Sequence, residues 1–376
     1  MNRRHFLYSG TAAAAVATRS MNARAYASIL GANDRVGLGV IGPGRRGTIV
    51  SSAFAQDSRV EFRALADVYD QQVTGFQGRF KEHVAKAAVS VEYQKMLERK
   101  DLDAVLISAP DHLHVEIAKD ALDANKNIYL EKPTLHRWSE RTTLEKAAAD
   151  SKSILQCGTQ QRSGAHYMRA KQEIFDAKKL GAVVFARAVW HNFPWQRRTI
   201  PSQPEPPGLN WDLFLGPAPH VPYETARYSS WRSYHDYGNG LLANILTHWA
   251  DVAQWMLNDS QPVSAVALGG DFQLHGGLTN PDTVSAVVRY KDWNLNFESS
   301  VLSIRSDHPS VFFEGTEGTL DIAREGTPSL PTAARPSRSQ RPRAWNARTP
   351  ATSLTPSSRA TRSTLHWRTA WQPVCP

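Results

Sequence analysis

A glycine-rich turn near the start of the chain constrains the fold more than any other feature. The run Gly42-Pro43-Gly44-Arg45-Arg46-Gly47 follows the apolar stretch 36–41, and Asp67 lies 20 residues beyond its last glycine, at the end of a second apolar run. When a glycine turn joins a strand to a helix, the backbone N–H groups of the turn and of the helix N-terminus point at a pyrophosphate. A carboxylate further along the chain can accept hydrogen bonds from the ribose hydroxyls. The arrangement predicts a dinucleotide site, whereas the glycines alone would also fit an ordinary loop.

The length and charge of the chain narrow its class. A chain of 376 residues exceeds what one ordinary core serves and predicts two domains. The formal net charge of +9 is concentrated at the ends: residues 1–30 carry four arginines and residues 327–376 carry eight, with no acidic residue in either segment. The 296 residues between them hold 32 basic and 35 acidic groups. A nearly neutral folded part lacks the basic face that nucleic-acid binding needs, so we expect no nucleic-acid partner.

Cysteine content and hydropathy exclude further classes of protein. The two cysteines, Cys157 and Cys375, cannot build a disulfide framework or a clustered metal site, so we expect no metal. No stretch reaches the roughly 18 apolar residues that cross a bilayer, so we expect no stable membrane insertion.

The first 30 residues resemble a twin-arginine export signal. Arg3-Arg4 precede Phe6-Leu7, an alanine-rich and weakly apolar segment follows, and Ala25-Tyr26-Ala27 offers a cleavage site between small residues. A disordered basic tail is the alternative interpretation. Export predicts a periplasmic location, and this route suits a protein that folds around a dinucleotide made inside the cell.

The segment 33–157 alternates short apolar runs with amphipathic segments, which is typical of βαβ units around a parallel sheet. Apolar runs and helical spacing predict strands at 35–41, 60–66, 104–108, 127–130 and 154–157 and helices at 45–55, 115–124 and 138–149. These elements predict a Rossmann domain.

The segment 158–326 has a different pattern. It predicts strands at 183–191, 283–290, 295–302 and 311–314, and one clear helix at 241–257. A sheet with few helices indicates an α+β domain with an open, mainly antiparallel or mixed sheet, serving substrate binding and oligomerisation.

The segment 327–376 contains eight Pro, eight Thr, seven Ser and eight Arg and has no hydrophobic periodicity. Such a composition cannot bury enough apolar surface to fold. It is either a disordered basic tail or the product of a reading-frame slip near Gly326. Both interpretations leave it without catalytic residues.

Two further turns follow apolar runs of the first domain. The run 103–114 ends a strand in Ala109-Pro110-Asp111-His112-Leu113-His114, and Glu131-Lys132-Pro133 follows the next strand. Both turns should lie at the carboxyl edge of the sheet, where open α/β sheets bind ligands. A lysine at this edge can orient a substrate hydroxyl and stabilise the oxygen as hydride leaves, although a lysine at a strand end is often only a solvated charge.

These motifs together resemble the Gfo/Idh/MocA oxidoreductases, the family of glucose-fructose oxidoreductase and inositol dehydrogenase. The resemblance runs from about residue 33 to 326. It rests on the glycine turn, the Ala-Pro-Asp-His-Leu-His turn, Glu131-Lys132-Pro133, Gly158-Thr159-Gln160-Gln161-Arg162-Ser163, Trp211 to Pro219, Trp231-Arg232, Asp236-Tyr237-Gly238 and Gly315 to Leu320. Two of these segments, Gly158 to Ser163 and Leu215 to Pro219, are similar to an exported subgroup of the family.

The resemblance implies a catalytic lysine, Lys132, next to the nicotinamide ring and the substrate. It also implies a helix that carries Asp-x-x-x-His, which here reads Asn244 to His248, followed by Asp251. The spacing of four residues puts Asn244 and His248 on one helical face, so His248 can act as acid/base. Asn244 can orient a hydroxyl but cannot raise the pKa of an imidazole as a carboxylate can, and Asp251 is a candidate to compensate.

The remaining site residues fall into two groups. Asp67 should bond the adenosine ribose and repel a 2′-phosphate, which favours NAD over NADP, although Arg45 and Arg46 could approach phosphate or simply lie at the surface. The expected cofactor-binding residues are Gly42, Gly44, Arg45, Gly47, Asp67, Pro110, His112, His114, Glu131 and Lys132. The expected substrate-binding residues are Arg162, Trp195, Arg232 and Asp251.

The first functional hypothesis is an oxidoreductase that passes hydride between a sugar or polyol hydroxyl and a tightly held NAD. The second is a glycosidase or lyase that oxidises a sugar transiently and returns the hydride. The third is a non-catalytic sugar-binding relative, which Asn244 in place of an aspartate would suit. A hydrophobic sheet face in the second domain should make the protein a homo-oligomer, either a dimer or a tetramer.

Overall fold

The computed structural model describes residues 35–191, 200–274, 277–302 and 309–324. Contacts divide the chain into two units. Unit 1 comprises the described residues up to Gly158 together with Glu205–Tyr223, and unit 2 comprises the described residues of Thr159–Pro204 and from Glu224 onward.

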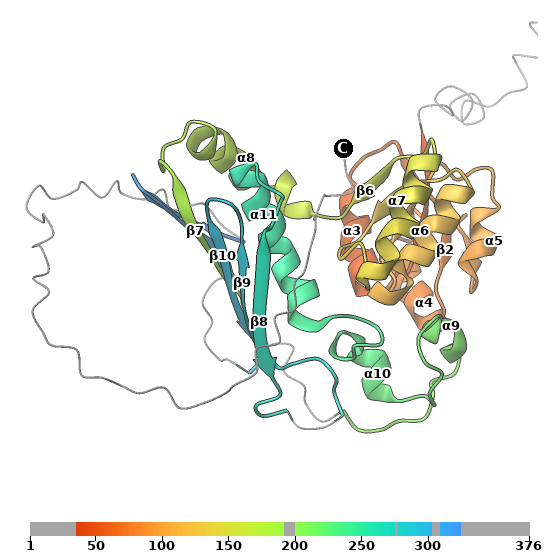
Figure 1. The fold of residues 1–376 in the computed structure, drawn as a ribbon. Coiled ribbons are helices and arrows are strands. Elements are labelled where there is room, and N and C mark those ends of the chain that lie inside the picture. The colour runs from red at the N-terminus through yellow and green to blue at the C-terminus, as the bar shows by residue number, and fades with distance from the viewer. Residues whose placement is uncertain (1–34, 192–199, 275–276, 303–308, 325–376) are drawn as a thin grey trace, which may run out of the picture. The chain divides into compact units, whose positions relative to one another are not determined.

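Unit 1 is built on a six-stranded parallel sheet (Figure 1). Its central strands are apolar enough to be buried on both faces, and every residue of the first strand after Val36 is buried. The strands are β1 (Val36–Ile41), β2 (Val60–Ala66), β3 (Ala88–Ser90), β4 (Ala104–Ile107), β5 (Asn127–Leu130) and β6 (Leu155–Cys157).

Helices cover both faces of this sheet. One buried cluster packs Val50, Val73 and Phe76 of the first two helices against β1 and β2. A second cluster packs the apolar stripe of the helix that begins at His114 against the strands. The helical elements are α3 (Arg45–Phe54), α4 (Asp70–Arg79), α5 (Tyr93–Leu97), η2 (Asp111–Leu113), α6 (His114–Asp123), η3 (Trp138–Glu140), α7 (Arg141–Asp150) and α9 (Trp211–Leu215). Unit 1 is therefore a doubly wound Rossmann fold, as the sequence predicts.

The strand order β3-β2-β1-β4-β5-β6 reverses direction between β1 and β4. The chain winds outward from β1 through β2 to β3, and then returns to the other side of β1 with β4. Open α/β sheets bind ligands outside the carboxyl ends of the strands at such a reversal. The glycine turn after β1 and the Pro110 turn after β4 flank this point.

Residues 205–223 belong to unit 1, although the sequence analysis assigned them to the second domain. Asn210 N donates to Val68 O at 2.7 Å, and Asp70 N donates to Gly208 O at 3.1 Å. In α9 the rings of Trp211 and Phe214 stack with their centroids 4.9 Å apart. These contacts join the segment to the end of β2 and the start of α4.

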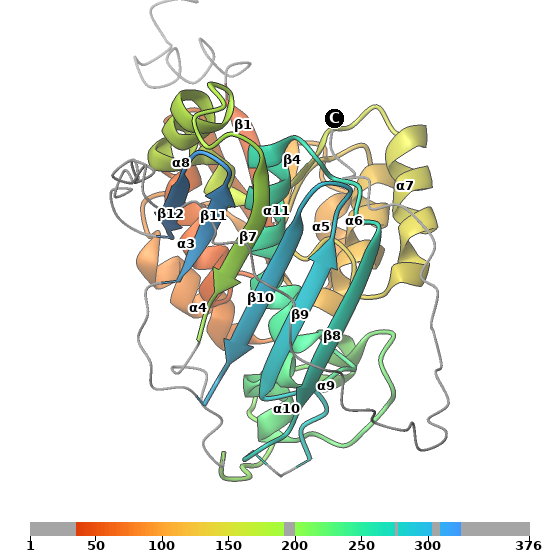
Figure 2. The ribbon, with the colours of Figure 1, turned by 60° about the vertical axis from the view of Figure 1, so that its left-hand side comes forward.

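Unit 2 contains a six-stranded sheet in the order β12-β11-β7-β10-β9-β8 (Figure 2). All neighbouring strands are antiparallel except β7 and β10, which are parallel, so the sheet is mixed as predicted. The strands are β7 (Val183–Val189), β8 (Ser264–Gly270), β9 (Thr283–Arg289), β10 (Asn294–Ser300), β11 (Ser310–Gly315) and β12 (Thr319–Ala323).

The helices of unit 2 cover one face of its sheet. Trp249, Val252 and Ala253 are fully buried against inward-facing residues such as Leu295 and Phe313. The segment predicted as one helix at 241–257 begins as a π-helix and continues as an α-helix. The helical elements are η4 (Gln160–Ser163), α8 (Ala165–Ala170), η5 (Lys171–Phe175), α10 (Thr225–Ser229), η7 (Trp231–Ser233), η8 (Leu242–Leu246) and α11 (Thr247–Leu257).

The opposite face of the sheet carries exposed side chains. Val266 of β8 is 60% exposed, Leu268 of β8 is 76% exposed and Val287 of β9 is 38% exposed. Cross-strand pairing aligns Val266 with Val287 and Leu268 with Ser285, so these side chains share one surface. In Figure 2 this face of the sheet is turned toward the viewer and α11 lies behind it.

Candidate functional site

The glycine turn packs directly against the end of β4. Gly42 has a φ of +79°, and a Cβ added there would lie 2.7 Å from Ala109 N. A Cβ at Gly47 would lie 2.3 Å from Gly42 O and 2.6 Å from Ser108 Oγ, which itself donates to Gly42 O at 2.7 Å. Gly42 therefore makes the turn possible, and Gly47 lets the helix that follows approach it closely.

Gly44 has a different environment from the other two glycines. A Cβ added there would meet only Gln72 Oε1, at an ordinary contact distance of 3.5 Å. Gly44 is also the N-cap of α3, and as a glycine it brings no side chain to cap this helix N-terminus. An uncapped N-terminus behind a residue without a side chain fits a pyrophosphate, since the N–H groups and the helix dipole favour an anion there. The residues present thus fit a dinucleotide.

Arg45 and Arg46 differ in their surroundings. Arg45 is exposed in the first turn of α3. Arg46 Nη2 donates to Glu131 Oε1 at 2.6 Å, in an ion pair whose arginine side chain is 27% exposed and whose glutamate side chain is 5% exposed. The partly exposed guanidinium of Arg46 thus reaches inward to the buried carboxylate of the Glu-Lys-Pro turn.

Asp67 follows the last residue of β2, at the same sheet edge as the glycine turn. Its carboxylate Oδ1 accepts a hydrogen bond of 2.9 Å from Tyr69 N. Burial raises the pKa of Asp67 to about 7, and the backbone hydrogen bonds from Tyr69 and Val68 oppose this shift only in part. The carboxyl group of Asp67 therefore titrates near neutral pH in the free protein.

The turn after β4 carries two buried histidines. His114 Nδ1 lies 2.7 Å from Pro133 O, and His114 Nε2 lies 2.9 Å from Ala109 O. His112 Nε2 lies 3.0 Å from Phe214 O, and burial lowers the pKa of His112 to about 4. Both rings bond main-chain carbonyls, so His114 joins the turn after β4 to the turn after β5. Direct contacts of Pro110, His112 and His114 with a cofactor remain predictions.

Lys132 lies on the turn after β5, two strands from β1 in the sheet. Glu131 N donates to Ile107 O at 2.9 Å, which fixes the start of this turn against the end of β4. The Lys132–Pro133 peptide bond is cis, and the Lys132 side chain is half-buried. Unit 1 thus brings the glycine turn, Asp67 and Lys132 to one edge of its sheet.

The proposed acid/base residue His248 and its neighbour Asn244 lie in unit 2. Asn244 in η8 and His248 in α11 are both buried, with exposures of 8% and 5%. The ring of Trp190 lies over His248 with a centroid separation of 5.8 Å, and the Arg324 guanidinium lies 4.2 Å from the Trp190 ring. A π-helical turn before an α-helix is common at functional sites, which suits the position of Asn244. No role was expected for Arg324 from the sequence.

Arg162 and Asp251, both expected to bind substrate, bond each other. Arg162 Nε lies 2.9 Å from each carboxylate oxygen of Asp251, and Arg162 Nη2 lies 2.7 Å from Oδ1. Burial raises the pKa of Asp251, while the hydrogen bonds from Arg162 oppose that shift. The Arg162–Asp251 pair connects η4 to α11. Binding of substrate by either residue remains a prediction.

The last two expected substrate residues have separate outcomes. The Arg232 guanidinium lies 4.0 Å from the centroid of the Trp231 ring, and Asn280 Nδ2 donates to Arg232 O at 2.9 Å. Trp195 lies outside the described residues.

Within the described ranges, no three His, Cys, Asp or Glu side chains are grouped as a metal site would require. No helix in those ranges is long and apolar enough to cross a membrane.

Two curated proteins show the range of activities among relatives of this chain. Inositol 2-dehydrogenase of Salmonella typhimurium (strain LT2) is 23% identical over 250 residues, which cover 66% of this chain and 61% of that enzyme. Glycosyl hydrolase family 109 protein 1 of Shewanella sp. (strain ANA-3) is 29% identical over 154 residues, which cover 35% of this chain and 34% of that protein. The chain therefore spans about three fifths of the first relative and about a third of the second.

A solved structure shows the same fold. The WlbA dehydrogenase from Bordetella pertussis, crystallised with NADH and UDP-GlcNAcA, matches with a TM-score of 0.63 at 18% identity, over 81% of this chain and 83% of that one. Residues 36–159 match the model of the oxidoreductase family's NAD-binding Rossmann fold, and residues 182–320 match the model of its C-terminal alpha/beta domain. The chain belongs to the Gfo/Idh/MocA family of oxidoreductases and carries that family's NAD-binding Rossmann domain.

Proposed function

We propose that the protein is an NAD-dependent oxidoreductase that acts on a hydroxyl group of a sugar or polyol. The observation that supports this most directly is one sheet edge of unit 1, where an uncapped helix N-terminus, Asp67 and Lys132 lie at the ends of β1, β2 and β5. The bound nicotinamide supplies the hydride acceptor. Lys132 orients the substrate hydroxyl and stabilises negative charge on its oxygen.

We assign the proton transfer to His248. An imidazole can accept the hydroxyl proton near neutral pH, and its burial in α11 limits exchange with bulk water. Asn244 orients a hydroxyl through its amide without taking a proton, since an amide does not titrate. Asn244 thus replaces the positioning role of a carboxylate but not its electrostatic role.

The preference for NAD over NADP is assigned to Asp67. A carboxylate at the end of β2 accepts hydrogen bonds from the two ribose hydroxyls and repels a 2′-phosphate. Arg46, one of the two arginines between Gly44 and Gly47, is engaged with Glu131. That pairing leaves one arginine fewer to attract a 2′-phosphate.

Redox-neutral cleavage of a glycosidic bond is the second candidate. It is favoured by the similarity of 29% over 154 residues to the family 109 glycosyl hydrolase protein. In this scheme a sugar hydroxyl is oxidised, the glycosidic bond breaks and the hydride returns, so the cofactor is unchanged at the end. The residues assigned above would serve the oxidation step of either reaction.

Lys132→Met tests the main proposal. Removing the ammonium should lower kcat by about 10²- to 10³-fold and change the Kd for NAD by less than about threefold, because a group that stabilises charge developing on the substrate oxygen acts mainly in the transition state. Purified protein would first be examined by native mass spectrometry for a retained nucleotide, and then assayed on a panel of sugars and polyols. A keto-sugar formed with NADH supports the first function, and glycosidic cleavage without net NADH supports the second.

The matched control for Lys132→Met is Lys119→Met, at an exposed position of α6. Equal activity of Lys132→Met and the parent would contradict the role assigned to Lys132.

The pH dependence of NAD binding tests the role of Asp67. The pKa of Asp67 in the free protein is raised to about 7, so lowering the pH through 7 protonates a group that the ribose needs as an acceptor. The Kd for NAD should therefore rise about tenfold from pH 8 to pH 6, measured by isothermal titration. Asp67→Asn should bind NAD more weakly at pH 8 and lose this pH dependence. A parent Kd that is constant over the range would refute the assignment.

We further propose export of the protein by residues 1–30. Replacement of Arg3 and Arg4 by lysine should hold the precursor in the cytoplasm, because the paired arginines are what the twin-arginine route reads. Cell fractionation and the mass of the mature N-terminus would check this. Periplasmic delivery of the doubly substituted protein at the parent level would exclude the route.

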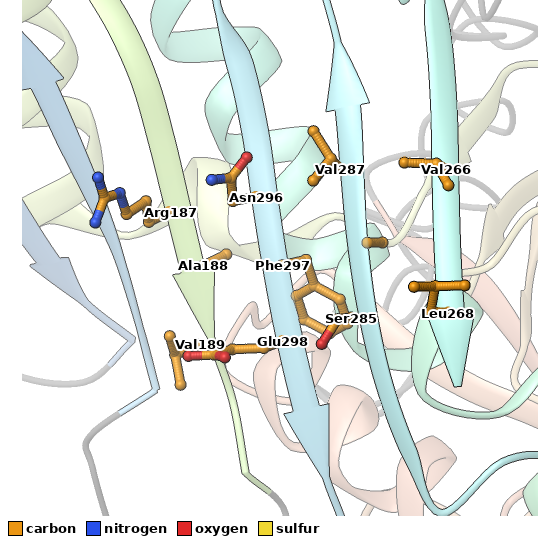
Figure 3. A pocket seen from close by; sticks show the side chains of 11 residues that line it. Arg187, Ala188, Val189, Val266, Leu268, Ser285, Val287, Asn296, Phe297 and Glu298 are labelled. Carbon is orange, nitrogen blue, oxygen red and sulfur yellow. The ribbon is translucent and has the colours of Figure 1, made fainter. Parts of the chain in front are cut away.

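We also propose that the outer face of the unit 2 sheet binds a second copy of the chain. Figure 3 shows the side chains of Val266 and Leu268 on β8 and of Val287 on β9. With Asn296 and Glu298 of β10 they line a shallow hollow of about 360 Å³. The edge strand β8 carries no charged residue, so nothing in it opposes association.

Leu268→Arg is expected to break this contact and yield monomers, because it places a charge in an apolar interface. Light scattering after size-exclusion chromatography would measure the mass. Ile154→Arg, at an apolar position of unit 1 that is 70% exposed, should leave the mass unchanged. A parent protein that is already monomeric at micromolar concentration would contradict the proposal.

A further inference from the structure

The Arg46–Glu131 pair joins two parts of the cofactor site that are 85 residues apart in sequence. Arg46 lies in the first turn of α3, directly after the glycine turn, and Glu131 directly precedes Lys132. The two side chains meet through Nη2 and Oε1 at 2.6 Å. This is the distance of a strong, charge-assisted hydrogen bond.

Glu131 needs a partner for its charge. Its side chain is only 5% exposed, and an isolated carboxylate at such a position would be strongly disfavoured. Three elements surround it: Arg46 of α3 binds the carboxylate, Tyr129 of β5 interacts with it electrostatically, and Gly158 lies beside it after β6. Burial and, to a smaller extent, the charge of Glu131 raise the pKa of Tyr129 to about 12, so the phenol is neutral. Arg46 therefore supplies the positive charge that balances the Glu131 carboxylate.

Gly158 makes room for the carboxylate. A Cβ added at Gly158 would lie 3.0 Å from Glu131 Oε1 and 3.1 Å from Tyr129 Cε1. Gly158 N donates to Leu130 O at 2.7 Å, which holds the end of β6 beside β5. A side chain at residue 158 would therefore press on the very oxygen that Arg46 binds.

We propose that Arg46 is a positioning residue for Lys132. Its guanidinium fixes and neutralises the Glu131 carboxylate, and so holds the Lys132 turn in a set position relative to the helix start that receives the pyrophosphate. The inference rests on the proposed function for the role of Lys132. Arg46 accordingly acts through Glu131 and not as a ligand of a cofactor phosphate.

The competing role, direct phosphate binding, has a different signature. A phosphate ligand contributes to NAD affinity whether residue 131 is Glu or Gln, and its contribution weakens with salt. A positioning residue that acts through Glu131 loses its effect once the carboxylate is gone. A double-mutant cycle separates the two roles.

The test compares the parent with Arg46→Met, Glu131→Gln and the double variant. An exposed ion pair of the same unit, Arg35 with Glu61 at 3.0 Å, provides the matched cycle through Arg35→Met and Glu61→Gln. The first readout is the midpoint of thermal unfolding from pH 5 to pH 8 without cofactor. The second is the pH profile of amine labelling at Lys132, followed by mass spectrometry, with Lys119 as internal reference. The third is the Kd for NAD at two salt concentrations.

In Arg46→Met the buried Glu131 carboxylate is unpaired, which raises its pKa in the folded state. Stability should then be lowest at pH 8 and recover as the pH falls and the group is protonated. The midpoint of Lys132 labelling should move to higher pH, because an uncompensated neighbouring carboxylate favours the ammonium. In the double variant, the pH-dependent loss of stability and the shift in Lys132 labelling should both vanish. We expect kcat to be about tenfold lower in Arg46→Met and to return to within about threefold of the parent in the double variant. The exposed Arg35–Glu61 cycle should show no coupling.

Two results would overturn the proposal. One is a loss of NAD affinity in Arg46→Met that is equal with Glu and Gln at residue 131 and is reduced by salt, which makes Arg46 a phosphate ligand. The other is additive behaviour in every readout, which removes the link to Lys132. If Arg46→Met does not fold, Gly158→Ala takes its place, since a Cβ there would displace the carboxylate that Arg46 binds. Arg46→Lys keeps the charge and should therefore show smaller stability and labelling shifts than either variant. The stability and labelling measurements need no substrate. If the protein shows no dehydrogenase activity, the proposed function is wrong, but these two measurements still test the role of the Arg46–Glu131 pair.

Discussion

The close contact between the glycine turn and the end of β4 determines where the other parts of the unit 1 site can lie. A Cβ at Gly42 would come within 2.7 Å of Ala109 N, and one at Gly47 within 2.3 Å of Gly42 O. The turn, the start of α3 and the end of β4 therefore share a space that admits no side chain. Because the strand order reverses between β1 and β4, this packing places an uncapped helix N-terminus at the edge that also carries Lys132.

Much of the fold could be predicted from periodicity, and what was missed has physical causes. The buried strands of unit 1 and the inward-facing alternation of β9 and β10 give clear patterns. Three strands were not predicted: β3 has only three residues, β8 is exposed along its length and so does not alternate, and β12 is a short antiparallel edge. The docking of residues 205–223 on unit 1 depends on tertiary hydrogen bonds, which no local pattern encodes.

The site shows the same division between local and long-range information. The glycine turn, Asp67 and Lys132 could be placed at one sheet edge because each lies within two residues of the end of a strand. Partners of charged groups could not be predicted, because they are distant in sequence: Arg162 meets Asp251 89 residues later. The main-chain contacts of His112 and His114 were equally hidden, since they depend on carbonyls in other turns. The sequence thus placed these residues at one sheet edge but did not reveal their contacts with distant parts of the chain.

An ion pair that is largely removed from water is seldom the most stable way to fill a site. The Arg46–Glu131 pair, whose arginine is 27% and whose glutamate is 5% exposed, therefore calls for another reason. Apolar residues of similar size would avoid the desolvation of two charges. Apolar contacts, however, are non-directional, whereas a charge-assisted hydrogen bond of 2.6 Å fixes the approach of two segments. An unpaired Glu131 would also repel the phosphates that the helix N-terminus attracts. Pairing removes that repulsion and leaves the N–H groups of α3 for the pyrophosphate, so the ion pair serves position and charge balance more than stability.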